Sequence, residues 1–299
     1  MNSYKKNLLV LHVTVLIFGL TGIFGKLLEG LGALNTVFYR VLIGALGMLA
    51  YAIWTKRSLK LASVKQLLKL AGVGAIISAH WFFFFESINV SNVSIALATI
   101  STTSLFVSLF QPLLTHRSLV GYEIVLGLLV IAGLMVILGY EFQYWKGIVY
   151  SLIAAALAAV FSLLNSNFIQ SEDSLRISFY EIASGALILC IVLASTSTLV
   201  LPQEISAEEW LWIVLLGIVA TSFAFIASVE VMKVLSPFTV SLTINLEPIY
   251  SIILALLIFK DDEHMSAQFY VGALIIIATL FINAYLKKKE RKKKTPLVI

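Results

Sequence analysis

The chain has 299 residues, of which 60% are hydrophobic and 12% are charged, with a formal net charge of +5 and a mean hydropathy of +0.99. Soluble domains are about half apolar and about a quarter charged, so this composition excludes an ordinary soluble globular protein. One core in water cannot cover this many apolar side chains, and lipid must surround much of the surface. The sequence therefore predicts a polytopic membrane protein.

Ten apolar segments of membrane-spanning length follow one another along the chain. A helix that crosses a hydrocarbon core of about 30 Å needs about 20 residues. The first segment is too long for the apolar part of a signal peptide and lacks a convincing cleavage site, so we expect it to stay in the mature protein. The predicted spans are Asn7 to Leu28, Asn35 to Trp54, Gln66 to Ile88, Ser91 to Thr115, Leu119 to Gly139, Lys146 to Ile169, Leu175 to Thr198, Glu208 to Lys233, Pro237 to Phe259 and Ala267 to Leu286.

The basic residues are distributed unevenly between the two sides of these spans. The side that carries both termini has 17 Lys and Arg, whereas the other side has four, at Lys26, Arg40, Lys146 and Lys260. Cytoplasmic loops are enriched in Lys and Arg, so we expect both termini to be cytoplasmic and the protein to lie in the cell (inner) membrane. The basic tail has no interleaved aromatic residues, which favours contact with membrane lipids over binding of nucleic acid.

The second half of the sequence repeats the first. The segment Phe38 to Leu46 recurs as Phe179 to Leu187 with five of nine positions identical, and Glu86 recurs as Glu230. Five spans in each half place the second half upside down in the membrane. The predicted fold is an all-α membrane protein with ten transmembrane helices in two inverted five-helix repeats, at residues 1–140 and 141–286, before a basic cytoplasmic tail at 287–299. Chance similarity between two apolar segments is the alternative.

Inverted repeats are typical of secondary transporters, which bind solute near the middle of the membrane between their two halves. Three motifs accompany the repeat: Phe38-Tyr39-Arg40, Leu246-Glu247-Pro248 and Gly272-Ala273-Leu274-Ile275. With these motifs the whole chain resembles the EamA family of the drug/metabolite transporter superfamily. The resemblance implies export or uptake of small metabolites, often amino acids, without ATP. That family often has a Ser-Pro or Thr-Pro step where this chain has Thr103-Ser104, so the sequence does not decide whether the fourth span is broken.

Polar residues inside the spans are candidates for binding the solute, because an ionisable group at a helix centre costs roughly 2.5 to 3.5 kcal/mol on insertion scales unless it is paired or wetted. Glu247 lies halfway along the ninth span, where Pro248 loosens the backbone. It is either a partner for a substrate amine or a proton, or a carboxylate that bonds the loosened backbone. The predicted substrate-binding residues are Glu247, Thr102, Thr103, Trp81, His80 and Asn245. For each hydroxyl, bonding to its own helix and close helix packing are favoured over substrate binding, and for His80 a hydrogen-bonded interior histidine is favoured over a proton relay.

Charged residues near the ends of the spans are candidates for gates. Glu86 and Glu230 end the third and eighth spans, while Arg40 and its repeat counterpart Glu181 enter the second and seventh. Arg40 is predicted to pair with Glu86 or Glu29 at the outer mouth, and such pairs could latch the two halves as they rock. A static interfacial pair is the alternative.

No motif of an enzyme was found. The four histidines are dispersed, Cys190 is the single cysteine, and no phosphate-binding glycine loop is present, so the sequence predicts no catalytic residue, no metal site and no cofactor. The prediction is an exporter of small organic metabolites such as amino acids, working by alternating access. An uptake carrier, a lipophilic-drug exporter and a membrane scaffold or receptor are the alternatives. Proton coupling and a homodimer stay open.

Overall fold

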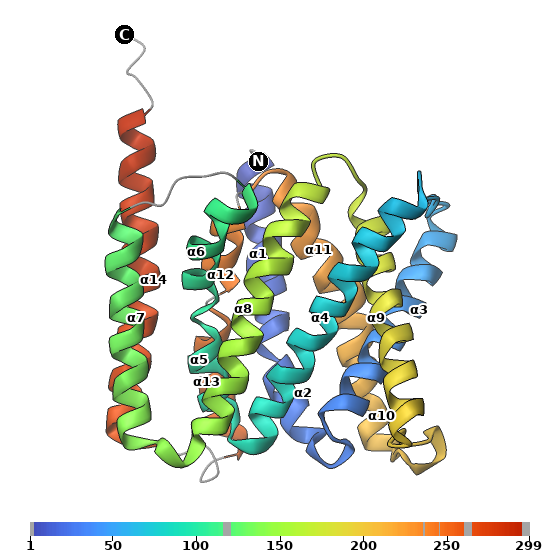
Figure 1. The fold of residues 1–299 in the computed structure, drawn as a ribbon, viewed down its shortest axis with the longest axis horizontal. Helices are drawn as coiled ribbons and strands as arrows, with labels where there is room; N and C mark the ends of the chain where they lie inside the picture. The colour runs from blue at the N-terminus through green and yellow to red at the C-terminus, as the bar shows by residue number, and fades with distance from the viewer. Residues whose placement is uncertain (1–2, 116–120, 236, 245, 260–264, 295–299) are drawn as a thin grey trace.

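The computed structural model describes residues 3–115, 121–235, 237–244, 246–259 and 265–294, and every regular element among them is a helix (Figure 1). The first half contains α1 (Ser3–Gly19), α2 (Thr21–Leu27), η1 (Glu29–Leu31), α3 (Ala33–Trp54), α4 (Val64–Val90), α5 (Val93–Ile100), α6 (Thr103–Thr115) and α7 (Gly121–Tyr140). The second half contains η2 (Phe142–Tyr144), α8 (Trp145–Phe168), α9 (Ser174–Thr196), η3 (Pro202–Glu204), α10 (Ala207–Val214), η4 (Leu215–Phe223), α11 (Ala224–Glu230), η5 (Val231–Lys233), α12 (Pro237–Ile244), α13 (Glu247–Phe259) and α14 (Ala267–Lys294).

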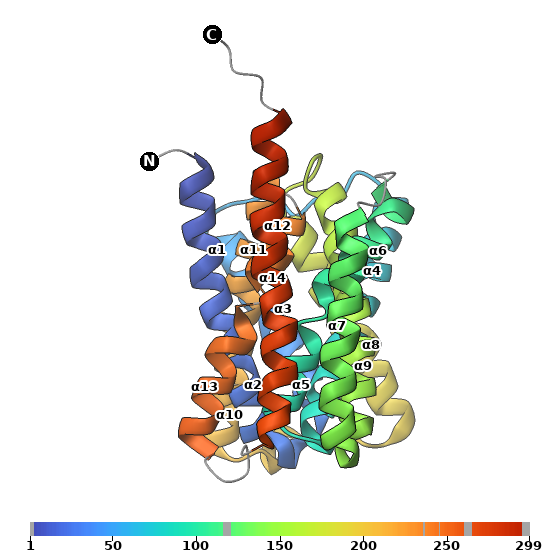
Figure 2. The ribbon, with the colours of Figure 1, turned by 90° about the vertical axis from the view of Figure 1, so that its left-hand side faces the viewer.

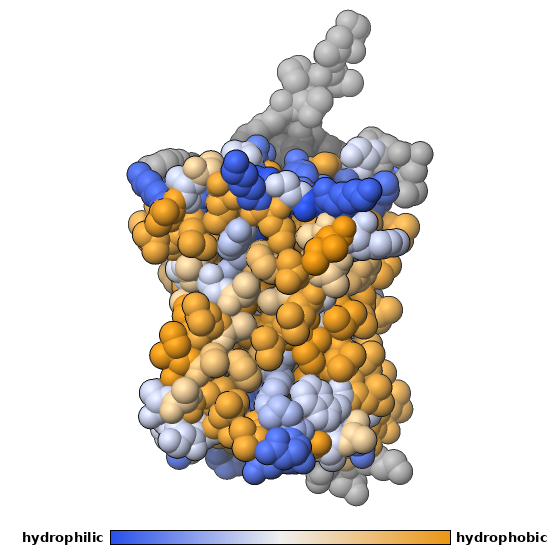
Figure 3. Space-filling view, turned by 90° about the vertical axis from the view of Figure 1, so that its right-hand side faces the viewer, coloured by the Kyte–Doolittle hydropathy of each residue, from blue (hydrophilic) through white to orange (hydrophobic). Residues whose placement is uncertain are grey.

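Much of the described chain is long and apolar enough to cross a membrane. Seven helical stretches meet that description, and they coincide with seven of the predicted spans: Ser3–Leu27, Ala33–Trp54, Val64–Val90, Val93–Leu114, Phe142–Phe168, Ser174–Thr196 and Ala207–Lys233. Three shorter apolar helices lie where the other spans were predicted: Val125–Tyr140, Ile249–Phe259 and Ala267–Asn283. Figure 3 shows a broad hydrophobic belt with hydrophilic side chains at both ends, as expected of a surface that faces lipid. The chain is a multi-pass membrane protein.

The helices cross the body in alternating directions. Both α1 and α14 have their terminal ends at the same end of the molecule, and α14 extends beyond the other helices there (Figures 1 and 2). We call this the terminal end. From it α9 descends, whereas its counterpart in the first half, α3, climbs toward it from the opposite end. Corresponding helices of the two halves therefore run in opposite directions.

Side chains at the helix N-termini fix several of the turns. The hydroxyl of Ser63 and the side-chain oxygen of Asn92 accept hydrogen bonds from backbone N–H groups in the first turns of α4 and α5. Asp173 does the same for two N–H groups of α9, and Ser206 and Glu209 form a reciprocal capping box at α10. These side chains accept hydrogen bonds from backbone N–H groups that have no partner within the helix at its N-terminus. The new helix can therefore begin directly after the loop with its first N–H groups bonded within the protein.

The fourth and ninth predicted spans are both interrupted, and the interruptions match. The N–H of Thr102 donates to the carbonyl of Thr99, and the N–H of Leu246 donates to that of Thr243. Both pairs occupy the same place within their repeats. The two broken spans lie antiparallel, with α5 against α13 and α6 against α12 (Figure 1). The fourth span is thus broken although no proline occupies its break.

Glycines allow the two halves to approach closely. A Cβ at Gly74 of α4 would overlap the carbonyl oxygen of Glu181 in α9, and a Cβ at Gly217 of η4 would lie 3.3 Å from that of Arg40 in α3. Gly74 and Gly217 are repeat counterparts, and so are Glu181 and Arg40. The same contact between the halves therefore occurs twice, with the glycine supplied once by each half, which is how small residues pack helices in membranes.

The eighth predicted span differs from the third because it contains a π-helix, η4. The chain has one more residue between Gly217 and Ser222 than between their counterparts Gly74 and Ser78. The hydroxyls of Thr221 and Ser222 donate to the carbonyls of Leu216 and Gly217, one residue further back than in an α-helix. One inserted residue accounts for the wider turn, and such turns are frequent at functional sites.

The pair formed by α7 and α14 lies at the left edge of the body in Figure 1 and faces the viewer in Figure 2. Gly133 and Gly272 bring the two backbones together, since a Cβ at Gly133 would lie 2.9 Å from the carbonyl oxygen of Gly272, and the reverse distance is 2.7 Å. The carboxylate of Glu141 accepts a hydrogen bond from the N–H of Ser266, at the start of α14. This pair joins the last helix of one half to the last helix of the other.

Candidate functional site

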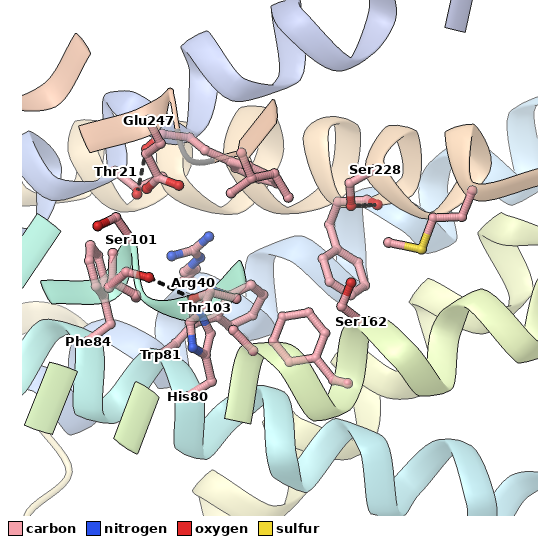
Figure 4. Close-up of a pocket in the computed structure, with 17 residues that line it drawn as sticks. Thr21, Arg40, His80, Trp81, Phe84, Ser101, Thr103, Ser162, Ser228 and Glu247 are labelled. Carbon is pink, nitrogen blue, oxygen red and sulfur yellow. Dashed lines mark hydrogen bonds between the residues drawn. The ribbon is translucent and has the colours of Figure 1, made fainter. Parts of the chain in front are cut away.

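A cavity of about 110 Å³ lies at the level of the helix interruptions (Figure 4). Its wall comes from both halves of the chain and is mainly apolar, with a few polar groups. Seventeen residues line it: Phe18, Thr21, Arg40, His80, Trp81, Phe84, Ile100, Ser101, Thr103, Ala158, Phe161, Ser162, Phe225, Ser228, Met232, Ile244 and Glu247. An apolar cavity with a small number of placed polar groups is the usual form of a binding site for a small molecule.

The cavity lies where the two halves meet. Its wall includes five pairs of repeat counterparts, all related by the same offset along the chain: Phe18 and Ser162, Trp81 and Phe225, Phe84 and Ser228, Ile100 and Ile244, and Thr103 and Glu247. Because each pair contributes one side chain from each half, the cavity sits at the centre of the internal symmetry. The side chains of most pairs differ, so a symmetric backbone surrounds an asymmetric lining.

Arg40 is the one arginine or lysine among the described residues of the cavity wall, and it is 1% exposed. Its Nε donates to the hydroxyl of Thr221 in the π-helix at 2.9 Å, and the centre of its guanidinium lies 3.9 Å from the ring centroid of Trp81. Its Nη1 has no hydrogen-bond partner among the described residues. Stacking on an aromatic face offsets part of the cost of burying the charge, and the free N–H groups remain available to an anionic group in the cavity.

Glu247 is the first residue of α13 and directs its carboxylate into the same part of the cavity as Arg40 (Figure 4). The two opposite charges interact electrostatically, but no direct ion pair joins them within the described structure. The interruption between α12 and α13 brings Glu247 to this position. Irregular backbone at membrane depth is tolerated where it lines a cavity, and here it carries one of the cavity's two opposed charges.

Aromatic side chains form much of the remaining wall. The rings of Trp81 and Phe225 meet edge to face at 6.0 Å, and His80 meets Phe161 in the same way at 5.3 Å. His80 Nδ1 lies 2.8 Å from the carbonyl oxygen of Ala154, and since a carbonyl oxygen only accepts, Nδ1 carries the proton of that hydrogen bond. This bond holds the imidazole against α8 and fixes one side of the cavity.

The structure brings four of the six predicted substrate-binding residues to the cavity, namely Glu247, Thr103, Trp81 and His80. The hydroxyl of Thr103 donates to the carbonyl of Ile100 in its own chain segment, at 2.7 Å. Thr102 is buried beside the break but is not part of the cavity wall. Asn245 lies outside the described residues.

The predicted pair between Arg40 and Glu86 is not formed. Arg40 lies inside the cavity instead of at the mouth, because Trp81 and Thr221 hold its guanidinium there. Glu86 remains near the far end of α4, where its carboxylate accepts a hydrogen bond from Asn89 at 3.5 Å, and Glu29 pairs with Lys26. Arg40 is therefore not a loop residue, and the side opposite the termini keeps three of its four predicted basic residues, Lys26, Lys146 and Lys260.

The other two predicted gates also differ from one another. Glu230 lies at the terminal end, where its carboxylate pairs with Lys233 at 2.8 Å and both side chains are more than a third exposed. Glu181 is not at a mouth, because its side chain is fully buried and bonded to Asn165 of α8. The sequence placed both at span ends, but only Glu230 is near the surface.

Several cavity residues were not predicted: Thr21, Ser101, Ser162, Phe225 and Ser228 among them. The repeat contained the signal for some of these. Phe225 is the counterpart of Trp81, so the repeat and the predicted role of Trp81 together point to Phe225. Ser228 is the counterpart of Phe84, which the sequence did not single out. Arg40 was singled out but assigned to the wrong place.

The fold and the cavity together define a multi-pass helical membrane protein with a central cavity between two repeats, whose wall contains Arg40 and Glu247. The family model for the EamA-like transporter family matches the chain twice, at residues 5–139 and 145–285. The chain belongs to this family, which confirms the resemblance seen in the sequence. A comparison with curated protein sequences found no match.

A solved structure described as "Crystal structure of protein" has a similar fold. It is 18% identical in sequence, the TM-score is 0.71, and the alignment covers 97% of this chain and 99% of that chain. At this identity the similarity concerns the fold alone. The arrangement of helices described above is thus shared with an experimentally determined protein over nearly its whole length.

Proposed function

We propose that this chain is a ten-span secondary transporter whose two five-helix repeats are inverted and which carries small zwitterionic metabolites, such as amino acids, by alternating access. The observation that carries the proposal is the opposed pair of Arg40 and Glu247 in a cavity built from both repeats. In such carriers the solute binds at mid-membrane between the repeats and is exposed to each side in turn.

The chemistry of the cavity favours a zwitterion. Arg40 can bind a carboxylate through the N–H groups that Thr221 leaves free, and Glu247 can bind an ammonium group. A zwitterion satisfies both charges without leaving a net charge in the membrane. A lone anion or cation would leave one buried charge without a partner. The aromatic wall formed by Trp81, Phe161 and Phe225 suits an apolar side chain on the solute.

The space available favours a small solute. The cavity volume of about 110 Å³ is well below the roughly 300 to 1,000 Å³ of pockets for drug-sized molecules. This supports metabolites over lipophilic drugs, which remain the second candidate because most of the wall is apolar.

The proposed direction is export. On α11 and the adjoining η5 the cavity residues Phe225, Ser228 and Met232 follow one another toward the terminal end. That end carries the basic loops and helix ends, including Lys56, Arg57 and Lys233, and the positive-inside rule makes it cytoplasmic. A cavity that extends toward the cytoplasm is suited to loading solute there. An uptake carrier is the alternative direction.

The proposal can be tested with the purified protein in proteoliposomes, with and without an imposed pH gradient. The probes are radiolabelled alanine, leucine and phenylalanine, with glutamate and lysine as charged analogues and tetraphenylphosphonium as a lipophilic cation. We expect saturable flux of at least one neutral amino acid, little flux of the two charged ones, and acceleration by the gradient. Flux of the lipophilic cation alone would favour a drug exporter, and no flux above empty liposomes would contradict transport.

The orientation has a separate test. In a background without Cys190, single cysteines placed between Lys56 and Lys69 should resist a membrane-impermeant thiol reagent in intact cells and react after the cells are opened. A cysteine placed beside Gln143, in the loop at the other end, is the matched control and should react in intact cells. The reverse labelling pattern would invert the topology.

A further inference from the structure

Glu181 is a carboxyl group that is completely buried outside the cavity. Its side chain is 0% exposed, and its Oε2 accepts a hydrogen bond of 3.1 Å from the side-chain amide of Asn165 in α8. Its Oε1 and the side-chain oxygen of Asn165 have no donor among the described residues. Two acceptor oxygens without donors are costly in an apolar interior. A proton on the carboxyl group would supply a donor that the site lacks.

The environment of Glu181 lacks a compensating charge. The elements that pack on α9 are α3, α4 and α11, and α8 contributes Asn165. No ion pair or other charged partner of Glu181 is found in the described part of the chain. The titratable residues on these elements are Tyr39, Arg40 and Tyr51 on α3, Lys65, Lys69, His80 and Glu86 on α4, Lys146 and Tyr150 on α8, Glu230 on α11, and Arg176, Tyr180 and Cys190 on α9 itself.

The repeat relates this buried pair to two residues of the cavity. Glu181 is the counterpart of Arg40, and Asn165 is the counterpart of Thr21. Arg40 and Thr21 both line the cavity, whereas Glu181 and Asn165 bond to each other away from it. The backbones around them correspond, since Gly74 abuts the carbonyl of Glu181 as its counterpart Gly217 abuts that of Arg40.

We propose that Glu181 is a second proton-binding residue of the transport cycle, buried in the present conformation and exposed to the cavity in the opposite one. The inference rests on the proposed function. In a carrier with inverted repeats, the opposite conformation arises when each repeat adopts the arrangement now seen in the other. Residues in the position of Arg40 then leave the cavity wall, and those in the position of Glu181 enter it.

This exchange would change the charge that the solute meets. In the present conformation Arg40 attracts the carboxylate of a zwitterion. In the opposite conformation Glu181 joins Glu247, so that two carboxyl groups face the solute and repel its carboxylate. Release of solute is then favoured when Glu181 exposes its carboxylate, and the carboxylate takes one proton from the water on the release side. The neutral group returns to its buried position beside Asn165. In the next opposite conformation it passes this proton to Glu247, which faces the cavity in both conformations and releases the proton on the loading side when the present conformation returns. Proton movement and solute movement become linked at this residue.

The test compares Glu181→Gln with Glu141→Gln in proteoliposomes, using the amino acid that is carried fastest in the panel above. Glu141 is a matched control because it is also a buried carboxylate, 4% exposed, but both of its oxygens have donors at the edge of the body. We expect Glu181→Gln to exchange labelled for unlabelled solute within about twofold of the wild type while its pH-gradient-driven accumulation falls about fivefold or more. Glu141→Gln should keep both activities.

Further variants keep the inference separate from the proposed function. Glu181→Asp retains an ionisable group and should recover gradient-driven accumulation, which a purely structural role does not predict. Glu181→Cys, without Cys190, should react with a water-soluble thiol reagent faster during solute exchange than without solute, even if Glu181→Gln proves unstable.

Normal gradient-driven accumulation by Glu181→Gln, or no reaction of the cysteine during exchange, would overturn the inference and leave transport intact. A requirement for Na⁺ that disappears in Glu181→Gln would also overturn it. Absence of flux in the wild type would instead reject the proposed function.

Discussion

The two interrupted spans have the same backbone and different chemistry. Around Thr102 and Leu246 the main-chain hydrogen bonds of the two repeats correspond one to one. The next residue into the cavity is Thr103 in the first half and Glu247 in the second. Thr103 bonds its own segment, whereas Glu247 faces Arg40. The comparison teaches that the repeat determines where the cavity lies, while the differences between its halves determine what the cavity can bind.

The largest effect on transport is expected from removing the carboxylate of Glu247, which the second half contributes to the cavity. Glu247→Gln keeps the shape and hydrogen bonding of the side chain but cannot release a proton or pair with an ammonium group. We predict wild-type expression and a fall of pH-gradient-driven flux of at least about 20-fold, because more than one pairwise interaction is lost. Flux in proteoliposomes measures this. Full gradient-sensitive transport by the variant would remove Glu247 from the mechanism.

The second-largest effect on transport is expected from removing the positive charge of Arg40, which faces Glu247 in the cavity. Arg40→Gln should raise the KM for a neutral amino acid about tenfold, the loss of about one charge-assisted hydrogen bond, and should leave Glu247 without its electrostatic partner. Arg40→Lys keeps the charge but not the planar guanidinium on Trp81, so we expect a smaller rise. The double variant of Arg40→Glu with Glu86→Arg should not recover transport, since these two residues are not in contact. If the double variant did recover transport, the predicted pair of Arg40 and Glu86 at the outer mouth would be supported after all.

A structural effect follows from the paired glycine contacts. Gly74→Ala should destabilise the protein by about 1 to 3 kcal/mol, because its new methyl group overlaps the backbone of α9. Gly72→Ala, two positions away on the same helix, has nothing within 4 Å of a Cβ and should be neutral or stabilising. Thermal unfolding in detergent compares the two. Equal melting temperatures would show that α4 and α9 can separate without cost.

The smallest effect is expected on the first-half side of the broken spans. Thr103→Val removes a hydroxyl that already donates to its own backbone at Ile100, so flux should change by less than about twofold. This result would confirm that the equivalent positions Thr103 and Glu247 are functionally unequal. A loss as large as that of Glu247→Gln would mean that the hydroxyl contacts the solute and that the two halves contribute equally.

Much of the fold could be predicted because lipid imposes simple rules. Apolar segments long enough to cross a bilayer and the repeat of Phe38 to Leu46 as Phe179 to Leu187 predicted the helical membrane protein and its family. The polar residues inside the spans were found for the same reason, since a buried ionisable group is rare and conspicuous. Glu247, Trp81, His80 and Thr103 do line the cavity, as their depth in the predicted spans suggested.

The tertiary structure alone decided which way the side chains face and which elements depart from a uniform helix. Arg40 and Glu181 occupy equivalent positions near the ends of apolar spans, yet one enters the cavity and the other is sealed against Asn165. Sequence gives distance along a helix, but the surroundings of a side chain depend on helices that are remote in the chain. The break at Ser101 and the π-helix at Leu215–Phe223 also depend on packing, because hydrogen bonds shifted by one residue differ little in local energy and neighbouring helices select among them.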